Sequence, residues 1–240
     1  MGRSFRTVSR VAFALLLVCS VLAIVPRSAL AYSCPPTGVH CYALNSWNGD
    51  TRGVAGDISI AYIYTNDGSN TSINNTIWLV DTTSNYWVEA GYRSNLGITN
   101  YYWGDVRPSD PMYRRHLMTQ IPGQHYGSGL DINISRENDN TSFVAAFHVN
   151  AVGYSSYNYS TNNTMIPGHI DIGQELSGTT GSHADPAAFT YNQWQTSDGY
   201  YHMQTDNGYT TYVGGPPQGY FSEYPSASAI GGIWHSLCGC

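Results

Sequence analysis

The sequence predicts an all-β protein, either a sandwich of two antiparallel sheets or a jelly roll. Three observations lead to this fold class. Short runs rich in β-branched and aromatic residues recur along the chain, and several of them alternate apolar with polar residues. Residues that favour turns separate these runs, and the sequence contains neither an internal repeat nor a long amphipathic helical pattern. Many short strands bounded by turn signals are typical of sandwiches and jelly rolls.

The first expected strands are bounded by turn residues such as Asn66-Asp67-Gly68 and Pro108 to Pro111. They are Ile58–Tyr64, Thr76–Val80, Tyr86–Tyr92, Asn100–Val106 and Arg114–Gln120. Later breaks fall at Pro122-Gly123, Pro167-Gly168 and Asp198-Gly199. The strands expected there are Leu130–Arg136, Phe143–Val152, His169–Gly173, Ala188–Trp194, Tyr200–Gln204 and Tyr209–Val213.

The composition excludes several classes of protein. Of the 240 residues, 11% are charged and 13% are aromatic, with 20 tyrosines. These values exclude a coiled coil and a charged disordered chain. The net charge of −6 argues against a nucleic-acid partner, because nucleic-acid-binding proteins need a basic surface.

Residues 1–31 have the pattern of a secretory signal peptide. Three arginines precede the uncharged apolar run Val11–Val25, and Ala29-Leu30-Ala31 is a small-residue cleavage signal. A membrane anchor or a lipoprotein modified at Cys19 is the alternative, but the run is short for a bilayer span of about 20 residues. We therefore expect a secreted, extracellular protein with no membrane contact, monomeric, and folded as one domain over residues 32–240.

Four cysteines remain after removal of the signal peptide, and an even number in a secreted chain predicts two disulfides. These residues are Cys34, Cys41, Cys238 and Cys240. A bridge between the two C-terminal cysteines would be strained, because only one residue separates them. We expect the N-terminal pair to bond to the C-terminal pair in either of two pairings. A metal site or a redox dithiol is the alternative for the C-x-C segment.

Glutamate is rare in the expected mature chain, and two of its four glutamates suggest chemistry. Glu89 lies in the middle of an expected strand between Trp87 and Gly91, although glutamate is depleted in strands. Glu175 follows a strand and would share its polar face with Asp171 if that strand continued. Two facing carboxyls can divide acid and base work when an aromatic neighbour desolvates one of them. The alternative is that each is a solvated strand residue or pairs with an arginine.

Other chemistry has weaker support in the sequence. The histidines are scattered without a metal-binding spacing, and no serine lies in a nucleophile elbow. We therefore expect no metal and no cofactor. Calcium at Asn138-Asp139-Asn140 is an alternative to a plain turn. Tyrosine clusters at Tyr101-Tyr102, Tyr154 to Tyr159 and Tyr200-Tyr201 would suit stacking on sugar rings or would simply be strand residues.

The order of several segments resembles the secreted glutamic peptidases (eqolisins) and their concanavalin-like jelly-roll relatives. The segments are Trp78 to Asp81, Tyr86 to Tyr92, Tyr101 to Trp103 and Ile170 to Glu175. In that family a glutamine and a glutamate on separate strands act on a water molecule at acid pH. The resemblance places Glu89 where the family has its glutamine, before Ala90-Gly91, and Glu175 where it has its catalytic glutamate. The resemblance implies a concanavalin-like jelly roll.

These observations predict an acid-pH hydrolase of an extracellular polypeptide or polysaccharide that uses the Glu89/Glu175 pair. The enzyme class stays open between a glutamic-peptidase-like and a glycosidase-like hydrolase. Four residues are expected to line the substrate groove: Trp87, Tyr101, Trp103 and Asp105. The alternatives are a non-catalytic carbohydrate- or cell-wall-binding module and a structural or coat protein without a site.

Overall fold

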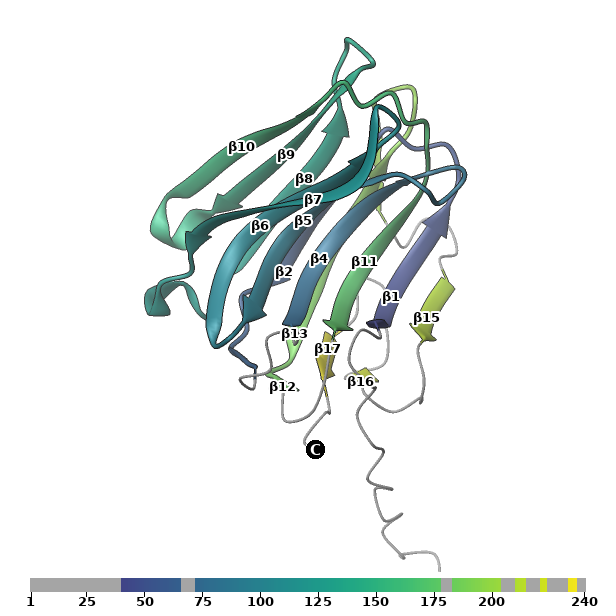
Figure 1. Ribbon diagram of the computed structural model, residues 1–240. Helices are drawn as coiled ribbons and strands as arrows, with labels where there is room; N and C mark the ends of the chain where they lie inside the picture. Colours follow the sequence, from purple (N-terminus) through teal and green to yellow (C-terminus); the bar gives the residue numbers. More distant parts are fainter. Residues whose placement is uncertain are drawn as a thin grey trace, which may run out of the picture. The chain divides into compact units, whose positions relative to one another are not determined.

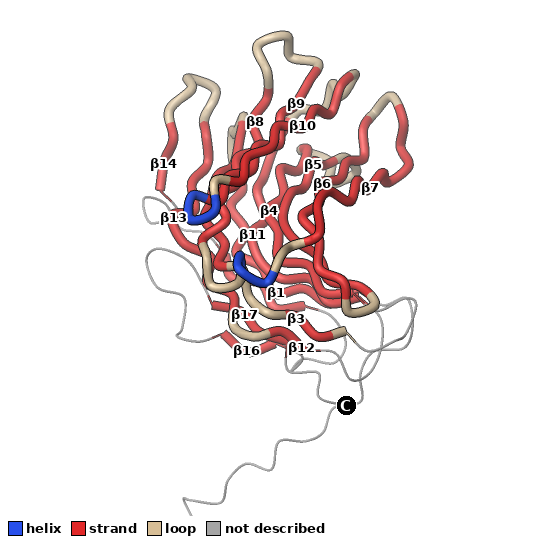
Figure 2. The backbone as a smooth tube through the Cα atoms, turned by 90° about the vertical axis from the view of Figure 1, so that its left-hand side faces the viewer, coloured by secondary structure: helices blue, strands red, loops and turns tan. Residues whose placement is uncertain are grey.

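The computed structural model describes residues 40–65, 72–177, 183–203, 210–214, 221–223 and 233–236. These residues form two antiparallel sheets packed in layers, so the predicted all-β sandwich is confirmed (Figure 1). Within the described residues the helical elements are two short 3₁₀ turns, η1 (Gly123–His125) and η2 (Asn150–Val152) (Figure 2). No helix in these ranges is long and apolar enough to cross a membrane.

Sheet A carries the predicted carboxyls. Its strand order is β15 (Thr210–Gly214), β1 (His40–Asn48), β11 (Pro167–Ser177), β4 (Ser72–Asp81), β5 (Trp87–Asn95), β6 (Ile98–Arg107) and β7 (Asp110–Gln120). Sheet B has the order β10 (Tyr154–Thr161), β9 (Ser142–Val149), β8 (Gly129–Arg136), β2 (Gly53–Ser59), β13 (Ala187–Gln195), β17 (Ile233–Ser236) and β16 (Phe221–Glu223), with β14 (Tyr201–Met203) paired to β13. A third sheet pairs β3 (Ile63–Tyr64) with β12 (His183–Ala184).

The alternation of apolar residues determines which face of each strand enters the core. On β8 the predicted apolar face is confirmed, since Leu130, Ile132 and Ile134 are all buried in the core cluster. From sheet A, β5 adds Val88, Ala90 and Tyr92 to the same cluster. The core therefore lies between the inner faces of the two sheets.

The buried Tyr92 also links sheet A to the segment that follows β2. Its hydroxyl accepts a hydrogen bond from the Ala61 N–H at 2.9 Å and donates one to the Ser59 carbonyl at 2.8 Å. A buried tyrosine normally finds such partners, because an unpaired hydroxyl would cost free energy.

Several element boundaries differ from the expected ones. Ile58–Tyr64 is not one strand, because β2 ends at Ser59 and β3 begins at Ile63. The expected strand Phe143–Val152 ends at Val149, where η2 begins. The strands β1 and β10 were not expected; β10 reads as polar because it is an edge strand with a wet outer face.

Two predictions fall outside the described residues. The expected signal peptide, residues 1–31, lies in an undescribed segment, and so do Cys34, Cys238 and Cys240 of the expected disulfides. The backbone of Cys41 belongs to β1, but its side chain is outside the description.

Candidate active site

One face of sheet A carries both predicted carboxyls. Glu89 on β5 lies opposite Trp78 on β4, and Glu175 on β11 lies opposite Asn74 on β4. Directly opposite residues of antiparallel strands share a face, and so do residues two or four apart on one strand. Glu89 and Glu175 therefore lie on the same face. Because the next residues on β5, Val88 and Ala90, enter the core, this is the face turned away from sheet B, here called the outer face of sheet A.

Glu89 is buried at 4% exposure and is held by two donors. The indole Nε1–H of Trp78 donates to its Oε2 at 2.6 Å, and the Tyr113 hydroxyl donates to its Oε1. Trp78 comes from the neighbouring strand β4, whereas Tyr113 reaches in from the edge strand β7. These two bonds fix the orientation of the carboxyl on the sheet.

The absence of a side chain at Gly104 makes room for this arrangement. Gly104 lies directly opposite Glu89 on β6. A Cβ there would lie 2.9 Å from Tyr113 Cε2 and 3.0 Å from Glu89 Oε1. A glycine within a strand often marks such a close approach.

Burial raises the pKa of Glu89 to about 7, and the negative charge of Glu175 adds to the rise. The hydrogen bonds from Tyr113 and Trp78 and the charge of Arg93 act in the opposite direction and only partly offset it. At mildly acidic pH the folded protein therefore holds Glu89 in its protonated form. Such a group can donate a proton or a hydrogen bond.

Glu175 sits in a second polar group on the same face. It is 9% exposed, and the Asn74 amide donates to its Oε2 at 2.6 Å. Arg93 Nη1 donates in turn to the Asn74 Oδ1 at 3.4 Å. Asn74 thus connects the Glu175 carboxyl with a cation on β5.

Asp171 is a third carboxyl on this face, because β11 continues through Glu175 as one strand. It lies opposite Trp78, so Glu89, Trp78 and Asp171 form one row across three neighbouring strands. The Ser46 hydroxyl donates to its Oδ1, and His169 Nε2 lies 3.4 Å from its Oδ2. These three polar residues line a cavity of about 480 Å³.

The surface beside Glu89 is apolar and aromatic. Leu44, Trp78 and Val80 form a small cluster, against which Tyr42 and Trp87 pack. Trp87 also stacks on Tyr113, with ring centroids 6.1 Å apart. Of the four residues expected to line the groove, Trp87 is the one that lies on the same face as Glu89.

The expected positions of Tyr101, Trp103 and Asp105 beside Glu89 are wrong. These three residues do share one face of β6, but Trp103 lies opposite Ala90 and Tyr101 lies opposite Tyr92. Both aromatic rings therefore belong to the core between the sheets. Because Gly104 lies opposite Glu89, it shares the outer face with it. The odd-numbered residues of β6 therefore lie on the inner face.

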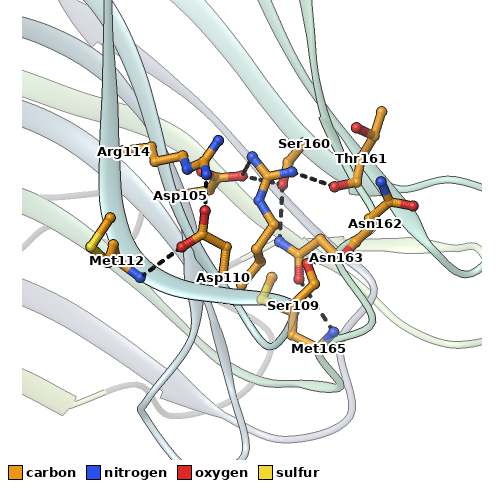
Figure 3. Close-up of polar contacts among 11 residues, drawn as sticks. Asp105, Ser109, Asp110, Met112, Arg114, Ser160, Thr161, Asn162, Asn163 and Met165 are labelled. Atoms are coloured by element: carbon orange, nitrogen blue, oxygen red, sulfur yellow. Dashed lines mark hydrogen bonds and ion pairs between the residues drawn. The ribbon is translucent and has the colours of Figure 1, made fainter.

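Asp105 belongs to a buried polar link between the two sheets. Its carboxylate pairs with Arg107 Nη2 at 2.8 Å and accepts a hydrogen bond from the Ser160 hydroxyl on β10. Asn163 donates to the same hydroxyl at 3.0 Å, and Figure 3 shows these groups pointing toward one another. With Asp105 at 0% exposure, its observed role is structural.

Two residues in direct contact with Glu89 were not predicted as site residues. Tyr113 lies just before the expected strand Arg114–Gln120, and Trp78 was noted only for the resemblance. The available signal was Gly104 in the aromatic run of β6, because a strand glycine indicates that another group approaches closely.

Comparison with known proteins shows similarity in fold. No family model matches the chain, and no curated protein matches it. A solved structure of scytalido-glutamic peptidase with a peptide-based transition-state analogue superimposes with a TM-score of 0.62 and 12% identity, covering 83% of this chain and 98% of the other. SCP-B, a member of the eqolisin family in complex with the tripeptide Ala-Ile-His, gives a TM-score of 0.60 at 12% identity and the same coverage. The chain therefore has the fold of the glutamic peptidases, the family that its sequence resembles.

Proposed function

We propose that this protein is a secreted hydrolase of extracellular polypeptides that works at mildly acidic pH. The observation that supports this most is Glu89, a buried carboxyl on the outer face of sheet A with a pKa raised to about 7. Perturbed carboxyls of this kind are typical of acid–base sites. Peptide ligands bound to both structural relatives support a polypeptide substrate.

In the proposed mechanism, protonated Glu89 donates a hydrogen bond to the carbonyl oxygen of the scissile bond. An ionised second carboxylate takes a proton from a water molecule, whose oxygen attacks the carbonyl carbon. The carbon–nitrogen bond then breaks, and the proton passes to the leaving amine. In the family that the sequence resembles, a glutamine donates this hydrogen bond. A glutamate can donate it only while it is protonated.

The neighbouring groups support this division of roles. Tyr113 hydrogen-bonds Glu89 and is 43% exposed, so it connects the buried carboxyl with the surface. The apolar cluster around Trp78, with Trp87 beside it, offers contact for apolar substrate side chains. Glu175 is the proposed base, and Asp171 is the second candidate because it lies in the same cross-strand row as Glu89.

Replacing Glu89 by glutamine tests the proposal. We expect Glu89→Gln to keep hydrolysis of an unfolded protein at about pH 4 and to extend it above pH 7, because an amide donates a hydrogen bond at any pH. Wild-type activity should fall as Glu89 ionises, with an apparent pKa near the value of about 7. The measurement is the pH–rate profile of kcat/KM on a labelled casein.

Three further variants complete the test. Glu89→Leu has no donor and should lose activity by a factor of about 10²–10³. Glu175→Gln and Asp171→Asn identify the base, because the variant that removes it should also lose activity at every pH. Cleavage of polysaccharide that Glu89→Gln abolishes would point to a glycosidase instead. Absence of hydrolysis by the wild-type protein at any pH would refute the proposal.

We also propose that the chain is exported and carries two disulfides joining Cys34 and Cys41 to Cys238 and Cys240. Non-reducing peptide mapping of the secreted protein is expected to recover cross-linked N-terminal and C-terminal peptides. Free thiols at these four positions would contradict the pairing.

A further inference from the structure

A second hollow lies on sheet B, whereas Glu89 lies on sheet A. Its volume is about 340 Å³, and its lining comes from five neighbouring strands, β10, β9, β8, β2 and β13. The lining residues Asp131 and Asn133 alternate with Ile132 of β8, whose side chain enters the core. The hollow therefore opens on the face of sheet B turned away from sheet A.

Five of the residues that line this hollow form one row across the sheet. Gln193, Ala55, Asn133, Ala146 and Tyr157 lie opposite one another in turn, from β13 to β10. The two alanines have small side chains and form the floor of the hollow. Tyr157, which is 68% exposed, stands at one end of the row. Four strand spacings of about 4.8 Å make the row about 19 Å long.

Tyr191 stands at the other end in a strained backbone conformation. It has a φ of +53° at a register shift in β13 and is 61% exposed. A bulge of this kind re-aims a side chain, and a non-glycine residue at positive φ costs free energy. The ring that this conformation positions is not among the residues packed against the core.

A second row, parallel to the first, is polar. Asp57, Asp131, His148 and Ser155 lie opposite one another on β2, β8, β9 and β10. His148 bonds Ser155 Oγ and Asn150 Oδ1, both at 2.6 Å, and Asn150 donates to Asp131 at 3.2 Å. Two carboxylates directly opposite each other destabilise a sheet, and among the residues that the structure describes no arginine lines the hollow to offset them.

We propose that this hollow binds a neutral oligosaccharide of about three or four sugar units, laid along the floor across the strands. Exposed tyrosines at both ends suit stacking on sugar rings, and carboxylates beside a floor of small residues suit acceptance of sugar hydroxyls. A peptide cannot bind here as an added strand, because the backbone groups of these central strands already form hydrogen bonds with their neighbouring strands. The site does not depend on the hydrolase proposed for sheet A.

The test is binding of the full mature protein to insoluble cellulose, chitin and β-1,3-glucan, followed by calorimetry with the hexasaccharide of any polymer that binds. We expect Tyr157→Ala and Tyr191→Gly each to weaken binding about tenfold. Glycine suits the positive φ at position 191, so this variant should fold at least as well as wild type. Asp57→Asn should weaken binding about tenfold or more, because hydrogen bonds to charged groups are stronger than neutral ones.

Tyr159→Ala is the matched control, since this tyrosine lies on the same face of β10, is 56% exposed and does not line the hollow. Its binding should equal that of wild type. Absence of binding to all three polymers would overturn the proposal. It would also fail if Tyr159→Ala lost as much affinity as Tyr157→Ala, or if the hollow bound polyarginine in place of the glycans.

Discussion

Replacing Asp105 by alanine is expected to lower the free energy of unfolding by about 3–5 kcal/mol. The substitution leaves the side chain of Arg107, which is only 12% exposed, without its anion. It also removes the acceptor of the Ser160 hydroxyl, and with it one of the polar links between β6 and β10; the hydrogen bond from Arg107 to the Thr161 carbonyl does not involve Asp105. Urea denaturation followed by tryptophan fluorescence measures the change, and the denaturant dependence should stay the same.

A neighbouring ion pair provides the control for this prediction. Arg114 and Asp110 also form a salt bridge (Figure 3). Their side chains, however, are 50% and 23% exposed. Asp110→Ala should therefore cost less than about 1 kcal/mol. A substrate-binding role for Asp105 predicts a changed KM with unchanged stability. Equal, small effects of the two variants would contradict the structural role.

The error at Asp105 shows which step of the sequence interpretation failed. Alternation correctly grouped Tyr101, Trp103 and Asp105 on one face of their strand, but it cannot say which face. That choice depends on the β5–β6 hairpin, whose two-residue turn pairs Asn95 with Ile98 and hence Glu89 with Gly104.

The turn itself gave little warning in the sequence. Its central residues, Leu96 and Gly97, have φ values of +52° and +71°, as a tight hairpin of this type requires. Glycine adopts such angles readily, whereas leucine rarely does. Without an Asn-Gly or Asp-Gly signal, the register and therefore the facing residues could not be read from the sequence.

The predictable part of the site was the unusual position of Glu89 in its strand. A glutamate at a mid-strand position needs a reason, and the structure supplies one in the donors Trp78 and Tyr113. The identity of these donors depends on pairing between β4, β5 and β7, which is tertiary information. Local pattern therefore identified the carboxyl but not the groups that hold it.

The strand β10 shows a similar limit of hydrophobic patterning. Tyr157 and Tyr159 point outward and Asn158 points inward on this edge strand, so the usual apolar-in pattern is reversed. The sequence marked the tyrosines as candidates for sugar contact, and the structure places Tyr157 at the edge of a hollow. In such a strand the outward tyrosines indicate a binding surface in the sequence. The strand itself is harder to recognise, because its inward residues are polar.

Replacing Glu89 by glutamine should stabilise the protein by about 3 kcal/mol at about pH 8 and by almost nothing at about pH 4. The reason is the rise of the Glu89 pKa from its ordinary 4.5 to about 7 on folding. Below the ordinary value, both the folded and the unfolded chain hold the proton, so the carboxyl adds no pH dependence. Between the two values the unfolded chain ionises first, and the wild-type protein loses stability as the pH rises.

Above about pH 7 both states are ionised, and the full cost of a buried carboxylate remains. Glutamine has nearly the same shape without the charge; its oxygen can accept from Trp78 while its amide donates to the Tyr113 hydroxyl. The measurement is the free energy of unfolding of both proteins in urea across this pH range. Because the Glu175 charge helps to raise the pKa of Glu89, Glu175→Gln should lower that pKa in the folded protein, so that the loss of stability becomes smaller and is complete at a lower pH. A difference between Glu89→Gln and wild type that stays constant with pH would show that Glu89 ionises in the folded protein as it does in the unfolded chain, and the proposed acid would then lack its basis.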